Sequence, residues 1–309
     1  MIEVEGLRKT YGDLVAVDGI TFRAEPGRIF GLLGPNGAGK TTTIGCICGL
    51  LQPSAGRIRV MGHDVVLEPR AARARMGLVP QELALYEELS AEENLRYWGA
   101  AYGLSGDALR RRVGAVLEVA ALLDRARTPV RKLSGGLKRR LNFACGIVHA
   151  PQVVLLDEAT VGVDPQSRVR LLDMVRALAK EGTCVLYTTH YMEEAQSLCD
   201  AIGIVDHGKL IALGSLDELR AMVGERDLVR FGGAFDHEAT AAALARIEGL
   251  ELLESAPGGV RIAMREASRR LPELFAALAA ARAEVRETTV IQPSLESLFI
   301  KLTGRELRD

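Results

Sequence analysis

The segment GPNGAGKTT, residues 34–42, constrains the fold of this chain more than any other stretch. It fits the pattern G-x-x-x-x-G-K-[ST] through Gly34, Gly39, Lys40 and Thr41, and it lies between an apolar, strand-like run and a helical run. Such a loop turns its backbone N–H groups inward on phosphate, and the following helix N-terminus adds positive potential. The pattern therefore predicts a nucleotide site, with Lys40 on the β- and γ-phosphates and Thr41 on Mg²⁺. The expected contacts are Gly34, Pro35, Asn36, Gly37, Ala38, Gly39, Lys40, Thr41 and Thr42.

Short apolar runs rich in valine and isoleucine recur along the first two thirds of the chain. Near-continuous apolar character is typical of strands that are covered on both faces, as in a parallel sheet. Helical patterns separate several of these runs, which indicates an α/β fold of the P-loop NTPase type. The expected strands are residues 28–34, 75–80, 152–158, 184–190 and 201–207.

Residues 90–149 break this alternation, and we expect them to form an all-helical subdomain. Ser90 and Glu93 have the spacing of a capping box, which marks the start of the first helix. The triplet 110–112 is interpreted as a solvated helix face. The triplet 138–140 is interpreted as a helix face to which no ligand is assigned.

The composition changes near residue 224. Beyond it, strand and helix patterns follow the order β-α-β-β-α-β, which is typical of a small ferredoxin-like domain, and a last helix follows. We therefore expect a nucleotide-binding domain at 1–222, with the helical subdomain at about 90–149, and a small α+β accessory domain at 223–309.

Composition and charge exclude several classes of protein. The 309 residues favour two domains, and 48% hydrophobic with 26% charged residues is typical of a globular protein. A net charge of −1 and a pI near 6.6 argue against nucleic acid or an anionic membrane as partner. The five scattered cysteines form no CxxC pair, so we interpret them as buried hydrophobic side chains in a reducing compartment. No signal-peptide layout or bilayer-length apolar run is present, so we expect a cytoplasmic protein that reaches the membrane's inner face through a partner.

The run VVLLDE ends in two carboxylates, Asp157 and Glu158. Ligands gather at the carboxyl ends of parallel strands, so we expect both acids to face the phosphate loop. Asp157 suits Mg²⁺, and Glu158 can polarise a water in line with the γ-phosphate. The structural alternative is a pair of acids that caps the next loop.

An ordered set of motifs over residues 1 to about 222 resembles the ATP-binding subunit of an ABC transporter. The set includes KTYG, the phosphate loop, LVPQE, LSGG at 133–136, VVLLDE, VGVDPQSR and TTHYMEEAQ, and a P-loop kinase or GTPase is not expected to carry LSGG. The resemblance implies that Tyr11 stacks on adenine and that Gln81 reaches Mg²⁺ and the attacking water. It also implies that Asp164 is the D-loop aspartate and that His190 bonds the γ-phosphate. The implied catalytic residues are Glu158, His190 and Gln81, and the implied metal ligands are Thr41, Gln81 and Asp157.

Each of these small motifs has a plainer structural alternative when taken alone. Tyr11 is then an edge-strand aromatic, His190 a satisfied strand-end histidine, and Gln81 carries no signal. The order of the motifs is what favours the functional interpretation. Three positions depart from the family pattern without removing a catalytic group: Leu137, Ala159 and Val163.

The resemblance also implies the assembly. Ser134, Gly135 and Gly136 head a predicted helix and offer donors to an anion. In the family they close over the ATP that is bound to the facing subunit, so the implied partners are a second copy of the chain and a separate integral-membrane permease. No nucleic-acid partner is expected.

The extra C-terminal domain and the ending SLESLFIKLTGRELRD resemble the ATPases of daunorubicin-type and nodulation-factor exporters. This resemblance implies export of a drug, antibiotic, lipid or glycan-like substrate. It also implies a regulatory or dimer-stabilising C-terminal domain, with a plain surface appendage as the alternative. A non-transport ABC ATPase that acts on ribosomes or DNA remains the second functional class.

Overall fold

The computed structural model describes residues 1–223, 226–291 and 294–303. The chain divides into two compact units between Leu216 and Asp217, and each unit has its own hydrophobic core. Residues 304–309 of the predicted accessory domain lie outside the described residues.

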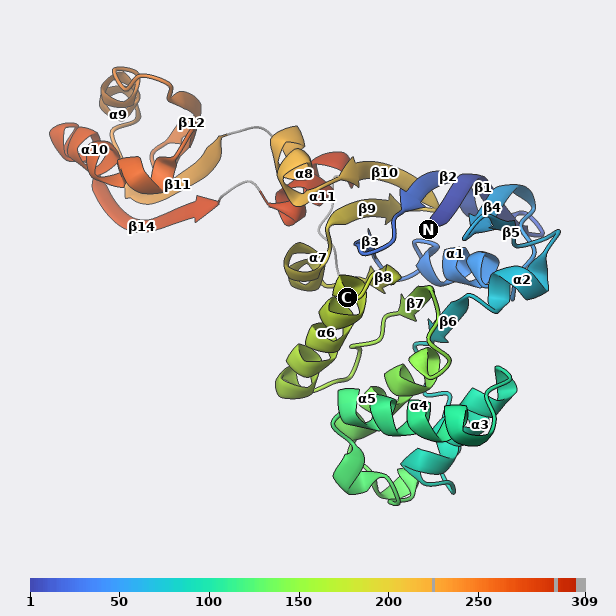
Figure 1. The fold of residues 1–309 in the computed structure, drawn as a ribbon. Helices are drawn as coiled ribbons and strands as arrows, with labels where there is room; N and C mark the ends of the chain where they lie inside the picture. Colours follow the sequence, from blue (N-terminus) through green and yellow to red (C-terminus); the bar gives the residue numbers. More distant parts are fainter. Residues whose placement is uncertain (224–225, 292–293, 304–309) are drawn as a thin grey trace. The chain divides into compact units, whose positions relative to one another are not determined.

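A six-stranded sheet forms the centre of the first unit, in the order β10–β9–β3–β8–β7–β6 (Figure 1). The strands from β9 to β6 run parallel, and β10 pairs antiparallel with β9. The inner strands are buried along their whole length, as the apolar runs predicted. The five predicted strands are β3 (Ile29–Leu33), β6 (Met76–Val79), β7 (Val153–Asp157), β8 (Cys184–Thr189) and β9 (Ala201–Asp206), and the sequence did not predict β10 (Lys209–Gly214).

A second, antiparallel sheet in this unit was also not predicted. Its strand order is β2–β1–β4–β5, and register shifts interrupt β1 against both of its neighbours. These shifts break the regular alternation by which a strand is detected in sequence. The strands are β1 (Ile2–Tyr11), β2 (Leu14–Ala24), β4 (Ala55–Val60) and β5 (His63–Asp64).

Helices cover the parallel sheet, and part of the antiparallel sheet packs directly against it, with the rings of Phe22 in β2 and Phe30 in β3 stacked at 4.6 Å. Helix α1 (Lys40–Ile47) contributes to the core that is shared by the two sheets. Helix α6 (Pro165–Lys180) packs in the other core with residues of β7 and β8. The short helices are α2 (Pro69–Arg73) and α7 (Met192–Leu198).

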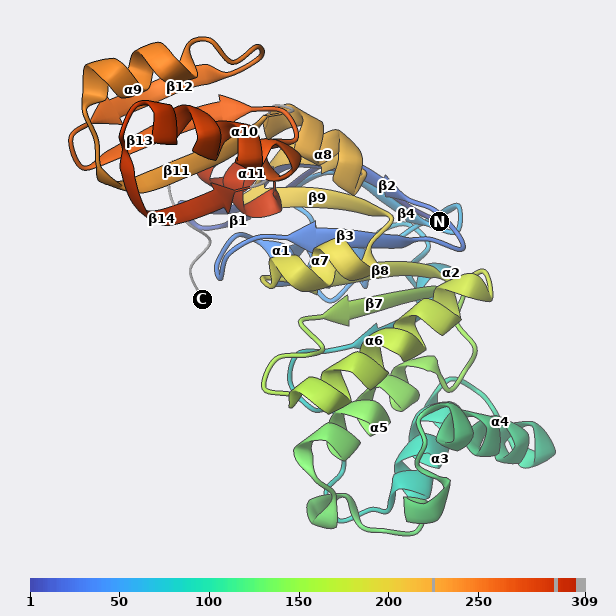
Figure 2. The same ribbon diagram turned by 90° about the vertical axis from the view of Figure 1, so that its left-hand side faces the viewer.

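Between β6 and β7 the chain forms only helices and one isolated bridge, from Ser90 to Pro129. Figures 1 and 2 show the three main helices grouped beyond the β7–β6 edge of the sheet. The predicted capping box is confirmed, because Glu93 accepts from the Ser90 N–H at 2.8 Å and the Ser90 hydroxyl accepts from the Glu93 N–H. The helices are α3 (Ala91–Ala101), α4 (Gly106–Val119) and α5 (Gly135–Ile147), with 3₁₀ turns η1 (Leu123–Arg125) and η2 (Val130–Lys132).

Helix α5 approaches β6 so closely that a glycine is required there. A Cβ on Gly77 would lie 1.9 Å from the carbonyl oxygen of Gly146. We expect Gly77→Ala to destabilise this unit by about 1–3 kcal/mol, as overpacking in a core does. Thermal unfolding checks this, with Gly114→Ala in α4 as the matched control, because no atom lies within 4 Å of a Cβ at that position. A stability loss no larger than that of the control would contradict the packing account.

The second unit begins at the start of α8 (Leu216–Val223) and contains the predicted β-α-β-β-α-β order. Its sheet is antiparallel, in the order β12–β13–β11–β14, and its core packs the sheet against two helices. The elements are β11 (Asp227–Ala234), α9 (His237–Leu244), β12 (Glu251–Ala256), β13 (Gly259–Met264), α10 (Ala267–Ala280), β14 (Glu284–Ile291) and α11 (Leu295–Thr303).

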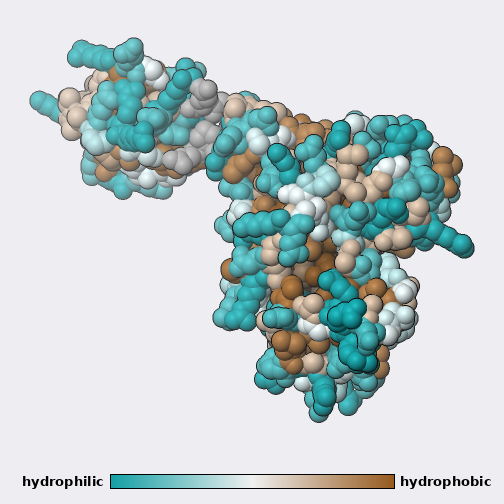
Figure 3. Space-filling view, in the orientation of Figure 1, coloured by the Kyte–Doolittle hydropathy of each residue, from teal (hydrophilic) through white to brown (hydrophobic). Residues whose placement is uncertain are grey.

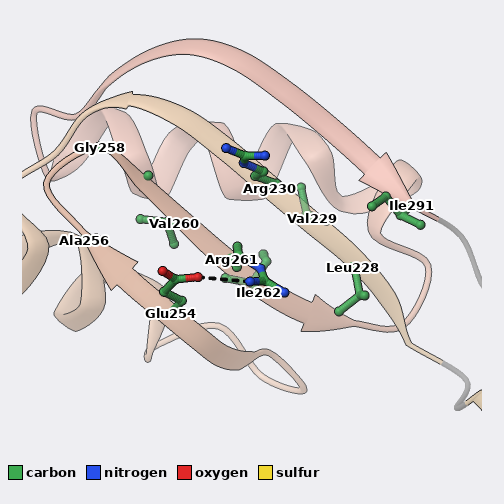
Figure 4. A pocket seen from close by; sticks show the side chains of 11 residues that line it. Leu228, Val229, Arg230, Glu254, Ala256, Gly258, Val260, Arg261, Ile262 and Ile291 are labelled. Atoms are coloured by element: carbon green, nitrogen blue, oxygen red, sulfur yellow. Dashed lines mark hydrogen bonds and ion pairs between the residues drawn. The ribbon is translucent and has the colours of Figure 1, made fainter. Parts of the chain in front are cut away.

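A cavity of about 500 Å³ lies along the strands of the β12–β13–β11–β14 sheet in the second unit (Figure 4). Its charged side chains are Arg230, Arg261 and Glu254, and the last two form an ion pair of 3.1 Å. The rest of the described lining is aliphatic side chains and backbone, so it holds no acid–base or nucleophilic set of the kind that catalysis requires.

The surface in Figure 3 is mostly hydrophilic, with hydrophobic side chains gathered around the region of β7 and α5. A gathered apolar surface of this kind is typical of protein contact sites. Among the residues that the structure describes, none of the helices has the length and apolar character that crossing a membrane requires.

Candidate active site

The glycine-rich loop joins β3 to α1, and the Lys40 side chain folds back against the backbone of this loop. The Lys40 ammonium donates to the carbonyl oxygens of Gly34 at 2.7 Å and Pro35 at 3.0 Å, and its side chain is 3% exposed. Gly39 precedes α1 with φ of 101°, and a Cβ there would lie 2.6 Å from the carbonyl oxygen of Ala16. No side chain caps α1, so its first N–H groups can face an anion.

Glu158 forms a buried cluster with Lys40 and His190. One carboxylate oxygen lies 2.9 Å from Lys40 Nζ, and the other lies 3.3 Å from His190 Nδ1. Glu158 directly follows β7 and has φ of 44°, a conformation that is uncommon for a residue with a side chain and recurs at functional sites. The cluster confirms that these three residues lie together, and it shows the glutamate paired with the loop lysine.

Asp157 and Thr41 place a carboxylate and a hydroxyl side by side at the loop. Asp157 is buried at the end of β7 and accepts from the Thr188 hydroxyl at 2.7 Å. Burial raises the pKa of Asp157, and hydrogen bonds from Thr188 and Thr41 oppose that rise. A carboxylate and a hydroxyl at a phosphate loop fit Mg²⁺, and a cation would favour the ionised carboxylate. No group of three or more His, Cys, Asp and Glu side chains within the described ranges forms a protein-only metal site.

Gln81 and Tyr11 lie at the edges of this arrangement. Gln81 is exposed and comes two residues after β6. Strand β6 pairs in parallel with β7, and Asp157 is the last residue of β7. Tyr11 ends β1 and is 46% exposed, with Lys9 Nζ 5.0 Å from the centre of its ring. Tyr11 pairs with Leu14 at the end of the β1–β2 ladder, near the part of β2 that touches Gly39. An exposed ring at this place is available for stacking.

The LSGG segment starts α5 and adjoins the start of α6. Ser134 is the exposed N-cap of α5, and its side chain accepts from the backbone N–H of Leu137. Asp164 caps α6 by accepting from the Ser167 N–H at 2.9 Å, and this bond lowers the pKa of Asp164. A Cβ on Gly136 would lie 2.1 Å from Ser167 Oγ, so the two helix N-termini are in contact. Gly135 beside it is exposed.

Residues 138–140 lie in helix α5, as predicted, but two of them have backbone partners that the sequence did not indicate. Arg140 is 7% exposed and donates to the carbonyl oxygen of Ala120 at 2.9 Å, at the C-terminus of α4. Arg139 donates to the carbonyl oxygens of Gln81 and, at 3.0 Å, Val161. It therefore ties α5 to the Gln81 loop and to the loop after Glu158. Spacing within one helix gives no sign of such partners, because both lie far away in sequence.

The first basic triplet, interpreted as a solvated helix face, needs a correction at one position. Arg112 donates to the carbonyl oxygens of Val148 and Ile147, both at 3.0 Å, and so satisfies the C-terminus of α5. Asn142 adds a further link that the sequence did not suggest, accepting from the N–H of Ala84 at 2.9 Å. Side chains that satisfy backbone groups thus join the helices to one another and to the loop after β6.

A glycine-rich phosphate loop, a strand-end acid pair and a histidine, all at the carboxyl ends of neighbouring parallel strands, define a P-loop nucleotide hydrolase. Comparison with known proteins narrows this class. The ABC transporter family matches residues 17–161, and the family described as "ATP-binding protein DrrA1-3-like, C-terminal domain" matches residues 214–303.

Curated relatives match along nearly the whole chain. The linearmycin resistance ATP-binding protein LnrL of Bacillus subtilis is 40% identical over 100% of both chains. The daunorubicin resistance ATP-binding protein DrrA3 of Streptomyces coeruleorubidus is 41% identical over 99% of this chain and 97% of its own. The Nod factor export ATP-binding protein I of Ralstonia nicotianae is 38% identical over 100% of this chain and 95% of its own.

Comparison with solved structures points to the same family. An ATP-binding subunit of an ABC transporter shares 32% identity at a TM-score of 0.67, over 72% of this chain and 93% of that one. The chain belongs to the ABC transporter ATP-binding proteins, in the branch of LnrL, DrrA and the Nod factor export protein. It is the ATPase subunit that couples ATP hydrolysis to transport by a membrane permease.

Proposed function

We propose that two copies of this chain bind two Mg²⁺–ATP between them and drive a separate permease that exports a drug, an antibiotic or a lipid- or glycan-like compound. The observation that carries the ATPase role is the cluster of Lys40, Glu158 and His190 at the phosphate loop. The cargo class is supported by the printed names of the relatives, which concern linearmycin, daunorubicin and Nod factor. Co-expression with a candidate permease tests this proposal. Co-purification and ATP-dependent export of such a compound are expected, and recovery of ribosomes or DNA in place of a permease would contradict it.

The cluster also suggests how ATP starts the reaction. In the structure Lys40 neutralises Glu158, so the carboxylate is held by a cation and is not free to orient a water. A γ-phosphate in the loop competes for the Lys40 ammonium, because charge-assisted bonds to phosphate are strong. Once released, Glu158 orients the attacking water, and His190 donates to the γ-phosphate. Binding of ATP thereby frees Glu158 to orient the water that attacks the γ-phosphate.

Thr41 and Asp157 would hold Mg²⁺, with Gln81 approaching from the neighbouring strand end. When bound, Mg²⁺ neutralises charge on the triphosphate. Asp157 serves this role only when ionised, and the two threonine hydroxyls that bond it favour that form. Tyr11 would stack on the adenine from the exposed end of β1.

Replacing Lys40 with alanine should weaken ATP binding by roughly 10- to 100-fold, because a hydrogen-bonded charge is lost from the phosphate. Equilibrium binding of a fluorescent ATP analogue measures this. Lys180→Ala is the matched control, since Lys180 is exposed in the last turn of α6. An affinity for Lys40→Ala equal to that of the control would remove Lys40 from the site.

The dimer is supported by the two exposed residues of the LSGG segment. Ser134 and Gly135 are exposed at the N-terminus of α5, with no acidic residue in the first turn of that helix, so they can receive an anion from outside the chain. Solved cassettes of the same fold form dimers, one of them with ADP and phosphate, at 24% identity and a TM-score of 0.64. Each ATP is then held by the phosphate loop of one copy and the LSGG segment of the other.

The C-terminal domain would have the ferredoxin-like fold, which its element order and its antiparallel strand order support. We infer a regulatory or dimer-stabilising role for it. Its separate core means that it need not unfold when the ATPase unit changes state.

A further inference from the structure

The buried carboxylate of Glu194 lies outside the proposed ATP site and links two loops of that site, the one after Glu158 and the one around His190. Glu194 in α7 is 3% exposed and accepts from the Tyr187 hydroxyl at 2.7 Å and the Thr189 hydroxyl at 2.8 Å. The Tyr187 oxygen also lies 3.2 Å from the hydroxyl of Thr160, two residues past Glu158. Burial and the charge of Glu194 raise the pKa of Tyr187 well above its usual range, so the phenol remains a donor.

The same carboxylate holds both neighbours of His190. Thr189 donates to Glu194 and accepts from the Tyr191 N–H at 2.9 Å. The Tyr191 ring lies 4.1 Å from the His190 ring, centre to centre. Glu194 therefore anchors Thr189 directly and the Tyr191 backbone through the Thr189 hydroxyl, and the imidazole lies against the tyrosine ring.

Arg168 connects Glu194 to helix α6, which Asp164 caps. Its Nε lies 3.6 Å from Oε1 of Glu194, and its guanidinium lies 4.9 Å from the centre of the Tyr191 ring. Within the described residues, both that Nε and that Oε1 are buried without a hydrogen-bond partner. Buried polar atoms are rarely left in this state, and 3.6 Å exceeds a hydrogen bond. A shift of roughly 0.7 Å between α6 and α7 would form a charge-assisted bond.

We propose that Arg168 and Glu194 are positioning residues that set the His190 side chain according to the position of α6. The proposal rests on the proposed role of His190. Asp164 caps α6, and Ser167 in the first turn of α6 contacts Gly136 at the start of α5, so the two segments that would face a second copy both adjoin this helix. Closure of the dimer moves α6, the Arg168–Glu194 bond forms, and Tyr191 holds the imidazole at the γ-phosphate. Completion of one site thus depends on contact with the other copy.

Kinetics of the full chain test this proposal. Arg168→Gln and Glu194→Gln should each lower kcat roughly tenfold while KM for ATP stays within about twofold, because a transition-state group is misplaced and ATP binding is not. In a His190→Ala background neither substitution should lower kcat further, because the route runs through that side chain. The proposal is overturned if kcat falls by the same factor in the parent and His190→Ala backgrounds. It is also overturned if kcat does not change in the parent background.

Arg176 provides a matched control on the same pair of helices. It lies two turns further along α6, bonds Asp173 at 2.8 Å and donates to the Ser197 carbonyl oxygen at the end of α7 at 3.1 Å. Arg176→Gln therefore removes an α6–α7 contact that does not reach Tyr191, and it should leave kcat unchanged. A tenfold loss in this variant as well would show that any loosening of α6 suffices and would overturn the specific assignment.

Hydrogen exchange separates failure of this proposal from failure of the proposed function. Peptides that contain residues 189–192 should exchange faster in ATP-bound Arg168→Gln than in ATP-bound Arg176→Gln. Equal exchange in the two variants overturns the positioning role, even if His190→Ala has no measurable turnover. If His190→Ala instead hydrolyses ATP like the parent, the catalytic role of His190 fails, and the exchange result still decides whether Arg168 positions the loop.

Discussion

Replacing Glu158 with glutamine is expected to lower ATP turnover roughly 10²- to 10⁴-fold, the usual contribution of a positioned general base. The amide keeps the shape of the carboxylate but has no charge with which to polarise a water. ATP binding should persist or tighten, because the resting ion pair of 2.9 Å between Glu158 and Lys40 no longer competes with the phosphate. Single-turnover hydrolysis and equilibrium ATP binding, measured on the same preparation, check both halves of this result.

Glu193→Gln is the matched control for the loss of a negative charge. Glu193 is an exposed glutamate in α7, three residues after His190, and its substitution should leave turnover unchanged. Parent-like turnover in Glu158→Gln would remove Glu158 from the mechanism. A large loss of ATP affinity in that variant would contradict the competition between Glu158 and phosphate for Lys40.

Mixed dimers are expected to show that each site is built from two chains. In Figures 1 and 2, β7 lies between α1, which begins at Lys40, and α5, which begins at the LSGG segment. A dimer of one Lys40→Ala chain and one Ser134→Arg chain keeps one site in which both residues are intact. We therefore expect up to about half of the parent ATPase rate from it, and almost none from either homodimer, because both substitutions remove contacts to the triphosphate.

The control reverses the arrangement of the same two substitutions. A dimer of the parent chain and a Lys40→Ala/Ser134→Arg chain has one defect in each composite site, so it should be nearly inactive. If each chain instead completed its own site, this second dimer would be active and the first would not. Two affinity tags allow both mixed dimers to be purified, and their relative ATPase rates decide between the two arrangements.

The parallel sheet was predictable because its strands are buried on both faces and need only a continuous apolar run. The antiparallel sheet was not, because β1 pairs with segments on both sides of the phosphate loop and its register is interrupted. Ile2 lies opposite both Ala24 and Val60, and the register shifts after Val4 and Glu5. Such pairing depends on contacts between distant residues, and no local pattern records it.

By itself, the sequence determined which residues gather at the phosphate loop, because Lys40, Thr41, Asp157 and Glu158 belong to local motifs whose strand context places them at one edge of the sheet. Only the tertiary structure decided which partner each charged side chain takes. It paired Glu158 with Lys40, buried Arg140 under the end of α4, and placed Arg168 between Glu194 and Tyr191. The reason is physical. The net effect of a charged side chain depends on its burial and on the groups that satisfy it, and folding brings those groups together from distant parts of the chain.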